Sequence, residues 1–426
     1  MAQQLYFSRD TKMFLEFDSF VWEIPVLDGF SFSQATNSSE ITLNEMESSA
    51  GVSRRGRRAF NDSLAPGEWS FSTYVRPFTA ASGGSLGAGK ADTQAEVHAV
   101  EEVLWALMAG ADNYGSAAYD KGGSAVLTPG GSNMTVSFAQ SNVAQLSTFN
   151  LYFVLGNANR TVMKLDGCVV GEASLDFDID GIATIAWSGN AANVVDFTGS
   201  TATATSAPAY NSNTADGTQI AVGDVFLDSD NSHKLQIVTV KPGSGNVTLG
   251  GYVNEAITDT TNFIRNRLTV LTVTPTTQDP DSDGTDELES SYSLTLTGGN
   301  VTISNNITFI TPEEIGTVNV PIGHVTGTRN VSGSFTCYLT EDTGTTNASR
   351  DFFEDLRAIT NVVTNSFALV FKIGGATGTG LELNMATSHV EIPTHSIEDV
   401  ISLETNFQAL PSTIDGTNEL ALTYRP

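Results

Sequence analysis

The sequence predicts an all-β fold with one short helix per repeat, arranged as two tandem copies with a small β insertion between them. The composition is the first indication, because the 426 residues are 40% hydrophobic and only 16% charged, with 39 glycines. Such a composition favours strands and turns over helices. The second indication is an alternation of apolar and polar residues with a period of two. The third is a series of motifs that recurs in the same order in both halves.

Helical periodicity occurs in two segments. Glu96–Ala109 places Val100, Leu104 and Leu107 on one face. Ser349–Ile359 does the same with Phe352, Leu356 and Ile359, and its first residue has the side chain of an N-cap. Each half of the chain is therefore expected to contain one short helix.

Alternation predicts strands in several places. In Leu175–Asp180 the odd positions are apolar and the even positions are all Asp, and Ala183, Ile185 and Trp187 continue the same phase. Phe149–Phe153 alternates likewise, whereas Trp69–Thr73 follows the pattern only in part. These segments are expected to bury one face and expose the other.

Four pairs of segments resemble each other in the same order along the chain. Because their separation shrinks steadily, insertions in the first copy explain the difference, and insertions in turn-rich segments cost little. The pairs are Asp28–Ser33 with Gly299–Ser304, Ser70–Val75 with Ser334–Leu339, Glu102–Leu107 with Glu354–Ile359, and Phe149–Phe153 with Phe367–Phe371.

The repeat divides the chain into copy one at 1–189 and copy two at 263–426. Residues 190–262 form either a small inserted β module or an elaborated linker. We favour the module because this stretch contains three short strand patterns separated by turn signals. They are Ala221–Leu227, Lys234–Val240 and Asn246–Tyr252.

The chain is strongly acidic, with 20 Lys and Arg against 48 Asp and Glu, a formal net charge of −28 and a pI near 4.3. Such a surface repels nucleic acid and anionic membranes. Solubility or a salt-rich host would also account for it. Cys168 and Cys337 are too far apart for a zinc motif or a disulfide scaffold. Met1–Phe20 has no apolar core of a signal peptide, so folding in a reducing cytoplasm with free thiols is expected.

One acidic loop resembles the first half of a calcium site. Asp279, Asp281 and Asp283 occupy positions 1, 3 and 5, and Gly284 occupies position 6. Position 12 is Ser290 where calcium loops have a bidentate Glu, and the flanking segments read as strands. We therefore interpret the segment as a solvated acidic loop, with calcium binding as the alternative.

No other pattern indicates catalysis or a cofactor. Asp176, Asp178 and Asp180 share one strand face, where we expect a wet acidic surface, although paired carboxylates also serve in acid–base chemistry. The sequence has no nucleophile elbow, phosphate loop or metal-binding pair of histidines. The prediction is a protein that is not an enzyme and needs no cofactor.

Ser53–Arg58 is the one basic cluster in this acidic chain. Nucleic-acid binding would need more basic surface and interleaved aromatic residues. A loop with Arg54, Arg55, Arg57 and Arg58 fits better as a contact to acidic faces of neighbouring subunits. We predict an assembly contact there.

Several segments together resemble the tail tube proteins of tailed phages. The resemblance covers both copies but not 190–262. It is carried by Asp28–Ser33, Ser53–Arg58, Gly67–Phe78, Asp166–Gly189, Thr311–Glu314, Ile322–Arg329 and Val331–Phe335.

The resemblance implies β-sandwich domains whose inner sheets join around a ring of six domains. Three duplicated chains would supply the six domains, with a homohexamer as the alternative, and stacked rings would form a tube in the virion. The implied partners are other copies of the chain, a tape measure protein, a terminator and possibly a sheath. DNA would pass through without specific binding, along a channel face with Asp176, Asp178 and Asp180. The alternative is another β-rich virion or surface protein, such as an adhesin, a capsid decoration protein or a tail terminator.

Overall fold

The computed structural model describes most of the chain as β-structure, and the predicted all-β fold is confirmed. Within the described residues no helix is long and apolar enough to cross a membrane. The described residues are 5–42, 56–80, 95–114, 119–138, 145–156, 161–197, 201–204, 225–228, 235–240, 248–249, 262–280, 283–286, 288–315, 317–341, 348–358, 366–397, 399–414 and 416–426.

The first half of the chain begins with a 3-10 turn, η1 (Ser8–Asp10), and contains sixteen strands and one helix among its described residues. Its elements are β1 (Lys12–Phe17), β2 (Phe20–Ile24), β3 (Ser31–Ser33), β4 (Thr36–Thr42), β5 (Arg57–Leu64), β6 (Gly67–Tyr74), β7 (Pro77–Thr79), β8 (Val97–Ala99), α1 (Glu102–Met108), β9 (Asn113–Tyr114), β10 (Tyr119–Lys121), β11 (Ser124–Thr128), β12 (Met134–Ser137), β13 (Phe149–Leu155), β14 (Thr161–Asp178), β15 (Thr184–Ala191) and β16 (Asn193–Asp196).

The second half begins after the insertion with the turn η4 (Asn266–Leu268). It continues with β21 (Val270–Pro275), β22 (Tyr292–Leu294), β23 (Leu296–Ser304), β24 (Ile307–Ile310), β25 (Gly323–Thr326), β26 (Asn330–Tyr338), α2 (Ser349–Ala358), β27 (Phe367–Ile373), β28 (Gly380–Val390), β29 (Thr394–Ile397), β30 (Ile401–Ala409) and β31 (Ala421–Arg425).

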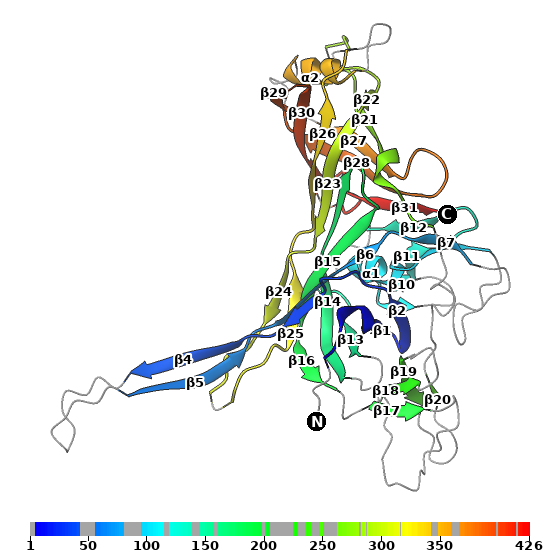
Figure 1. Ribbon diagram of the computed structural model, residues 1–426. Coiled ribbons are helices and arrows are strands. Elements are labelled where there is room, and N and C mark those ends of the chain that lie inside the picture. Colours follow the sequence, from blue (N-terminus) through cyan, green and yellow to red (C-terminus); the bar gives the residue numbers. More distant parts are fainter. Residues whose placement is uncertain are drawn as a thin grey trace.

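The strands of the two halves pair in the same pattern. All of these pairs are antiparallel, and in each half a hairpin leaves the sheet between two paired strands: β4–β5 between β3 and β6, and β24–β25 between β23 and β26 (Figure 1). The corresponding pairs are β1–β2 and β21–β22, β1–β13 and β21–β27, β3–β6 and β23–β26, β6–β15 and β26–β30, β13–β14 and β27–β28, and β14–β15 and β28–β30.

The register corrects one of the motif matches. Ser31 lies opposite Ser70, and the sequence matches would therefore place Thr302 opposite Ser334. Asn300 lies there instead. The first match is thus shifted by two residues, and Ser31 corresponds to Asn300. A shift of two keeps every side chain on its face of the sheet, because the side-chain period is two.

The alternation in β6 is cleaner than its sequence suggested. Trp69, Phe71 and Thr73 are all buried, and the residues between them are not. Thr73 is accommodated in the core because its hydroxyl accepts a hydrogen bond from Trp187 Nε1 at 3.0 Å. A buried hydroxyl with a partner costs little, so a polar residue takes an apolar place in the pattern.

The predicted first helix is too long at its N-terminal end. Val97–Ala99 forms β8, which pairs with β7, and α1 begins only at Glu102. Every residue of α1 is buried, so it crosses the interior of the first half and presents no solvent face. In the second half the α2 prediction is accurate in extent. Ser349 was predicted to be the N-cap and is the first helical residue. Its hydroxyl donates to Tyr338 O at 2.7 Å and accepts from Thr340 N–H at 2.8 Å.

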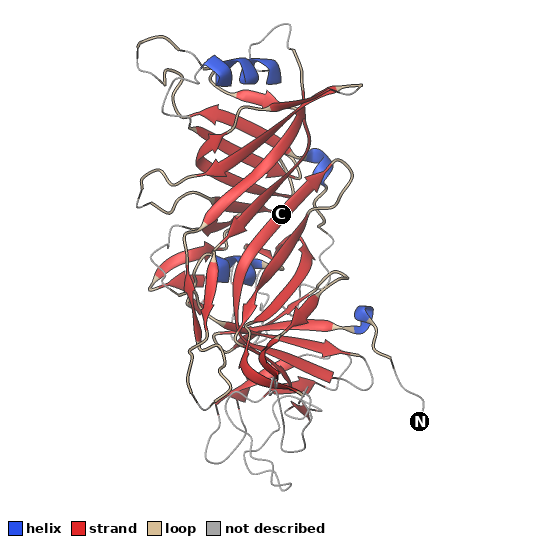
Figure 2. Ribbon diagram, turned by 90° about the vertical axis from the view of Figure 1, so that its left-hand side faces the viewer, coloured by secondary structure: helices blue, strands red, loops and turns tan. Residues whose placement is uncertain are grey.

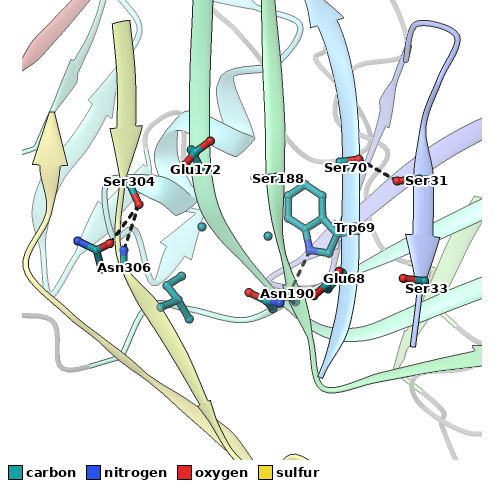
Figure 3. Close-up of a pocket in the computed structure, with 13 residues that line it drawn as sticks. Ser31, Ser33, Glu68, Trp69, Ser70, Glu172, Ser188, Asn190, Ser304 and Asn306 are labelled. Atoms are coloured by element: carbon teal, nitrogen blue, oxygen red, sulfur yellow. Dashed lines mark hydrogen bonds between the residues drawn. The ribbon is translucent and has the colours of Figure 1, made fainter. Parts of the chain in front are cut away.

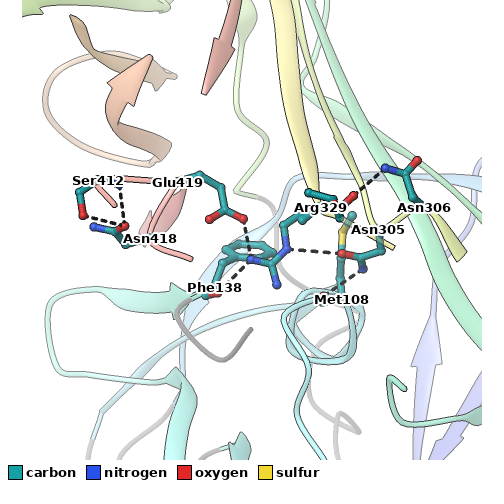
Figure 4. A network of polar contacts seen from close by, with 9 residues as sticks. Met108, Phe138, Asn305, Asn306, Arg329, Ser412, Asn418 and Glu419 are labelled. Atoms are coloured by element: carbon teal, nitrogen blue, oxygen red, sulfur yellow. Dashed lines mark hydrogen bonds and ion pairs between the residues drawn. The ribbon is translucent and has the colours of Figure 1, made fainter. Parts of the chain in front are cut away.

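The last strand, β31, holds the two halves together on the outer layer. It pairs with β28 of the second half on one side and with β12 of the first half on the other. Next to it, Arg329 donates to Phe138 O at 2.9 Å and to Glu419 at 2.8 Å, and its Nε lies 3.4 Å from Asn305 Oδ1 (Figure 4). Asn305 in turn donates to Met108 O at 3.1 Å. This network joins β-strand ends of the second half to α1 of the first.

The insertion carries a small sheet of its own. Its strands are β17 (Thr201–Ala204), β18 (Val225–Asp228), β19 (Leu235–Val240) and β20 (Thr248–Leu249), in that order. Leu235 is fully buried in a cluster with Phe14, Val21, Tyr152 and Val162 of the first half. β18, β19 and β20 overlap the three predicted short strands, whereas β17 was not predicted. Leu235 anchors the sheet beside β1, β2 and β13, below the main sheets in Figure 1.

Three glycines on the core side of the sheet lie under aromatic rings of the neighbouring strand. Gly189 lies opposite Trp69, Gly299 opposite Phe177, and Gly333 opposite Phe407. A Cβ at Gly189 would lie 2.0 Å from Val169 O and 2.6 Å from the Trp69 ring. The ring fills the place of the missing side chain, so a larger residue must displace it.

Gly189→Ala should lower the free energy of unfolding by about 1–3 kcal/mol, the usual cost of overpacking a core. Thermal or chemical denaturation of the two proteins measures this difference. Gly323→Ala is the matched control, since nothing lies within 4 Å of a Cβ there. Equal stability of Gly189→Ala and wild type would contradict the steric argument.

Candidate functional site

The two halves share one continuous antiparallel sheet. Its strand order is β3–β6–β15–β14–β23–β26–β30–β29, so that β14 of the first half pairs directly with β23 of the second. The pairing runs from Glu172 opposite Ser304 to Asp178 opposite Gly298. Figure 2 shows strands side by side along most of the length of the molecule. We call the joint between β14 and β23 the seam.

One face of this shared sheet packs on the core and the other carries mainly polar side chains. Directly opposed residues share a face, so the register traces rows across both halves. One row runs from Ser72 through Ala186, Ser174, Thr302 and Ser332 to Gln408. The next runs from Tyr74 through Thr184, Asp176, Asn300 and Ser334 to Asn406.

The polar face carries small hydroxyl and amide side chains and a set of acidic ones. Among the described residues of the segments that pair in the shared sheet, which for β14 is the part from Val169 to Asp178, no Lys or Arg points to this face; Lys164 lies in the earlier part of β14, which pairs with β13 and β16. Its carboxylates are all exposed, and they are Glu68, Glu172, Asp176, Asp178 and Glu404. The face is therefore wet, negative and without any cation that would bind a polyanion.

Hydroxyl groups on the polar face bond to one another across strands. Ser31 and Ser70 lie 2.8 Å apart, and Ser174 and Thr302 lie 3.2 Å apart across the seam. Cross-strand pairs of this kind contribute about 0.2–1 kcal/mol each. They also satisfy the hydroxyls locally, which leaves fewer groups free to bind a ligand.

A shallow groove of about 490 Å³ lies at one end of the polar face (Figure 3). Ser31, Ser70, Ser188, Glu172 and Ser304 line it from five neighbouring strands. It contains no nucleophile and base within hydrogen-bond distance of each other among its labelled side chains. The groove is a widening of the polar face at the end where both hairpins depart.

The structure places two of the three predicted acidic residues on this face. Asp176 and Asp178 are exposed on β14, but the strand ends at Asp178. Asp180 lies in the turn that follows, 3.9 Å from Arg267. Asp178 accepts the Gly181 N–H at 2.6 Å and so closes this turn. Gly181 ends the alternation, which explains why Asp180 leaves the row that its spacing predicted.

Two of the four predicted assembly arginines lie at the start of β5. β4 and β5 form a two-stranded hairpin that projects from the body, and nearly all its residues are exposed (Figure 1). Arg57 Nε lies 3.1 Å from Glu40 of the opposite strand, with both side chains largely exposed. Arg58 lies opposite Ile41, whereas Arg54 and Arg55 lie outside the described residues.

The acidic loop at 279–285 is only partly described, because Asp281 lies outside the described residues. Asp279 accepts the backbone N–H groups of Asp283 and Gly284 at 3.1 and 2.9 Å. Asp283 accepts the Thr285 N–H at 2.8 Å. Carboxylates occupied in this way stabilise a turn. Among the residues described, no group of three or more His, Cys, Asp or Glu is placed to hold a metal ion.

A buried acidic cluster at the start of α1 was not predicted. Glu101 is fully buried and accepts from the Tyr424 hydroxyl at 2.7 Å, while that hydroxyl accepts from Trp105 Nε1 at 2.6 Å. Glu102 bonds to His98 at 3.0 Å and to the Tyr119 hydroxyl at 3.2 Å. Burial raises the pKa of Glu101 to about 7. Because these groups have no access to solvent, we interpret the cluster as structural.

A comparison with known proteins finds a relative of this chain. No family model matches the chain. The chain is 28% identical over 402 residues to the tail tube protein pb6 of Escherichia phage T5, in an alignment that covers 93% of this chain and 69% of pb6. The chain is a homologue of this phage tail tube protein. The resemblance inferred from the sequence is thus confirmed.

Sequence reasoning identified only part of the polar face of this tail tube homologue. Asp176 and Asp178 were found because they alternate with buried Leu175 and Phe177. Glu68, Glu172 and Glu404 were missed, although each follows the same alternation on its own strand. The phase of all eight strands would have revealed them, but only once the strands were known to share one sheet.

Glu101 should make the stability of this tail tube homologue depend on pH. The pKa of Glu101 in the folded protein lies above the ordinary value of 4.5, which applies to the unfolded chain. The folded state therefore holds the proton more tightly, and this contribution to stability is fully present below pH 4.5. This contribution is lost as the pH rises towards 7. Glu101→Gln should therefore gain stability relative to wild type between pH 4.5 and 7, as measured by denaturation at several pH values. A constant difference between the two proteins over this range would contradict the assignment.

Proposed function

We propose that this chain builds the tube of a phage tail, with the polar face of the shared sheet lining its channel. One observation carries the proposal. A single chain already joins the sheets of two similar halves edge to edge, and the common face is acidic and free of Lys and Arg in the described strand segments that pair in this sheet. Homology to pb6 supports the structural role. DNA could slide along such a face without sticking, because it offers no counter-charge to the phosphates.

The proposed domains are copy one at 1–189 and copy two at 263–426, with the insertion between them. The repeated strand pairings support this division, and β16, which pairs with β14, extends the first copy by a few residues. Three chains would supply six domains to a ring, and rings would stack into a tube. We prefer this to a homohexamer because each chain contains two of the units. Tape measure, terminator and sheath proteins are the proposed partners in the virion.

The β4–β5 hairpin is the proposed contact between neighbouring subunits or rings. A two-stranded hairpin with few buried side chains is marginally stable alone, so it gains from a partner surface. Ile41 and Phe60 are 52% and 45% exposed on it, next to Arg57 and Arg58. By the strand register, Ile41 and Phe60 share a face of the hairpin with Arg58, whereas Arg57 lies on the other face beside Glu40. An exposed apolar pair next to an arginine fits an acidic neighbour, which another copy of this chain provides.

Assembly can be tested by negative-stain microscopy of the purified protein under virion-like conditions. We expect tubes whose averaged end-on views have threefold symmetry with six similar lobes. Reversing the charge of Arg54, Arg55, Arg57 and Arg58 to Glu should block assembly and leave the monomer folded, whereas replacing them by Lys should preserve tubes. Persistent monomers of the wild type would sink the tube proposal, and normal tube yield of the Glu variant would sink the role of the arginines.

The channel face can be tested by reversing its charge. Tubes of Asp176→Lys/Asp178→Lys should bind duplex DNA at low salt and release it as salt increases, because added cations replace counterions on the phosphates. Wild-type tubes should not bind. Asp10→Lys/Glu354→Lys makes the same change in net charge at exposed positions away from this face. Equal DNA binding by both variants would argue that the polar face is not the channel.

A further inference from the structure

The shared sheet ends in two open edges. β3 pairs only with β6, and β29 pairs only with β30, among the strands that the structure describes. Neither strand contains Lys, Arg or Pro, the residues with which proteins usually protect a free edge. Ile397 at the end of β29 is 78% exposed. Both edges are therefore suited to pairing with another strand.

The seam shows how one such pairing is made. It joins β14, the edge strand of the first copy's part of the shared sheet, to β23 of the second. In the next step around a ring, the equivalent of β14 in the second copy would meet the equivalent of β23 in the next chain. The repeated pairings identify both equivalents residue by residue.

The place of β14 is taken in the second copy by β28 followed by β29. Leu165 lies opposite Leu151 on β13, and Met385 lies opposite Leu369 on β27. These two pairs correspond, since Leu151 matches Leu369 in the repeat. Leu165 therefore corresponds to Met385.

The same sequence offset between equivalent residues of the two copies holds at the other end of these strands. Asp176 lies opposite Thr184 on β15, and Ser396 lies opposite Ser402 on β30. The number of residues from Leu165 to Asp176 equals the number from Met385 to Ser396. Asp176 therefore corresponds to Ser396, and β29 corresponds to the part of β14 that forms the seam.

The place of β23 is taken in the first copy by β3. Ser31 lies opposite Ser70 on β6, and Asn300 lies opposite Ser334 on β26. Ser70 and Ser334 begin matching segments of the repeat. Ser31 therefore corresponds to Asn300, which faces Asp176 across the seam.

We propose that β29 of one chain pairs antiparallel with β3 of the next chain, with Ser396 opposite Ser31 and Thr394 opposite Ser33. This pairing rests on the proposed ring and specifies its interface. It repeats the seam between chains, so that joints within and between chains alternate around the ring. The polar face then continues from one chain to the next without a break.

The side chains at the proposed joint fit this register. Ser174 and Thr302 bond across the seam, and their equivalents Thr394 and Ser33 form the same kind of hydroxyl pair. On the core side, Ile397 takes the place of Phe177, which is 4% exposed. Pairing with β3 covers Ile397 as the seam covers Phe177. An apolar side chain that is exposed in one chain becomes buried in the ring.

A disulfide tests the register directly. Ser396→Cys/Ser31→Cys should form bonds between chains in oxidised tubes, seen as linked dimers and trimers on non-reducing gels. The two positions lie at opposite edges of an eight-strand sheet, about 34 Å apart at about 4.8 Å per strand, so a bond within one chain is excluded. Cys168 and Cys337 are fully buried, so the wild type should give no such ladder.

Two controls make the result specific. Asp176→Cys/Asn300→Cys should form a bond within the chain, because these residues face each other at the seam. Ser396→Cys/Ser33→Cys is shifted by two residues and should link chains several-fold less. Tubes without links from the Ser396/Ser31 pair, or with stronger links from the shifted pair, would overturn the register while leaving the tube proposal intact.

Hydrogen exchange on the wild type covers the case in which the cysteine variants do not assemble. Amides of 394–397 and 31–33 should become protected when monomers form tubes. Tubes in which these amides exchange as fast as in the monomer would overturn the pairing. Absence of tubes and of protection in the wild type would count against both the ring and this interface, and protection without tubes would retain the interface alone.

Discussion

The antiparallel pairing of β14 with β23 is the constraint on which the rest of the structure depends. It fixes the second half relative to the first through seven directly opposed residue pairs. Because opposed residues share a face, it also forces the core sides of both halves onto one side and the polar sides onto the other. On the outer layer, β31 pairs with both β12 and β28, and the network around Arg329 lies next to it. These contacts hold the two halves in the same arrangement. A shift of one residue at the seam would turn the polar face of one half towards the core.

The two faces of these strands differ in their side chains and in what those side chains do. On the core side, rings such as Trp69, Phe177 and Phe407 cover glycines of the next strand and let the layers approach closely. On the polar side, Ser, Thr and Asn pair with one another and leave carboxylates as the exposed charges. A smooth surface with satisfied hydroxyls and no cations has little affinity for a passing polyanion. Chemistry of this kind needs no catalytic group, and the buried Glu101 and Glu102 serve the packing of α1 and β31.

Local pattern predicted the faces of the strands, and long-range pairing decided the rest. Alternation gave the correct buried residues at Leu175, Phe177, Ala183, Ile185 and Trp187, because each strand carries its own period. It was wrong at Ile179, which lies beyond the end of β14 and is 41% exposed. The β8 strand was read as helix because the predicted helix was extended from its face at Val100, Leu104 and Leu107 back to Glu96. The pairing of β8 with β7 is a long-range contact that periodicity does not reveal. The motif match was wrong by two residues, because it paired Ser31 with Thr302 where the strand register pairs it with Asn300. An alternating motif fits equally well after a shift of two, so the sequence does not distinguish the two alignments. The seam itself lies between segments more than a hundred residues apart, so the full extent of the polar face could not be read from the sequence.

Duplication within one chain changes how a ring of such sheets can form. Half of the joints are made inside a chain, where the tether supplies a high effective concentration and β14 extends unbroken for 18 residues. The other half are left to β3 and β29, which have three and four residues. The equivalent of β14 is interrupted before β29 at Glu391–Pro393, and Pro393 limits how far the free edge extends. Short edges pair weakly one at a time, which protects the free chain from uncontrolled strand addition. A closed ring satisfies all of them at once, so the architecture favours closure over open-ended aggregation.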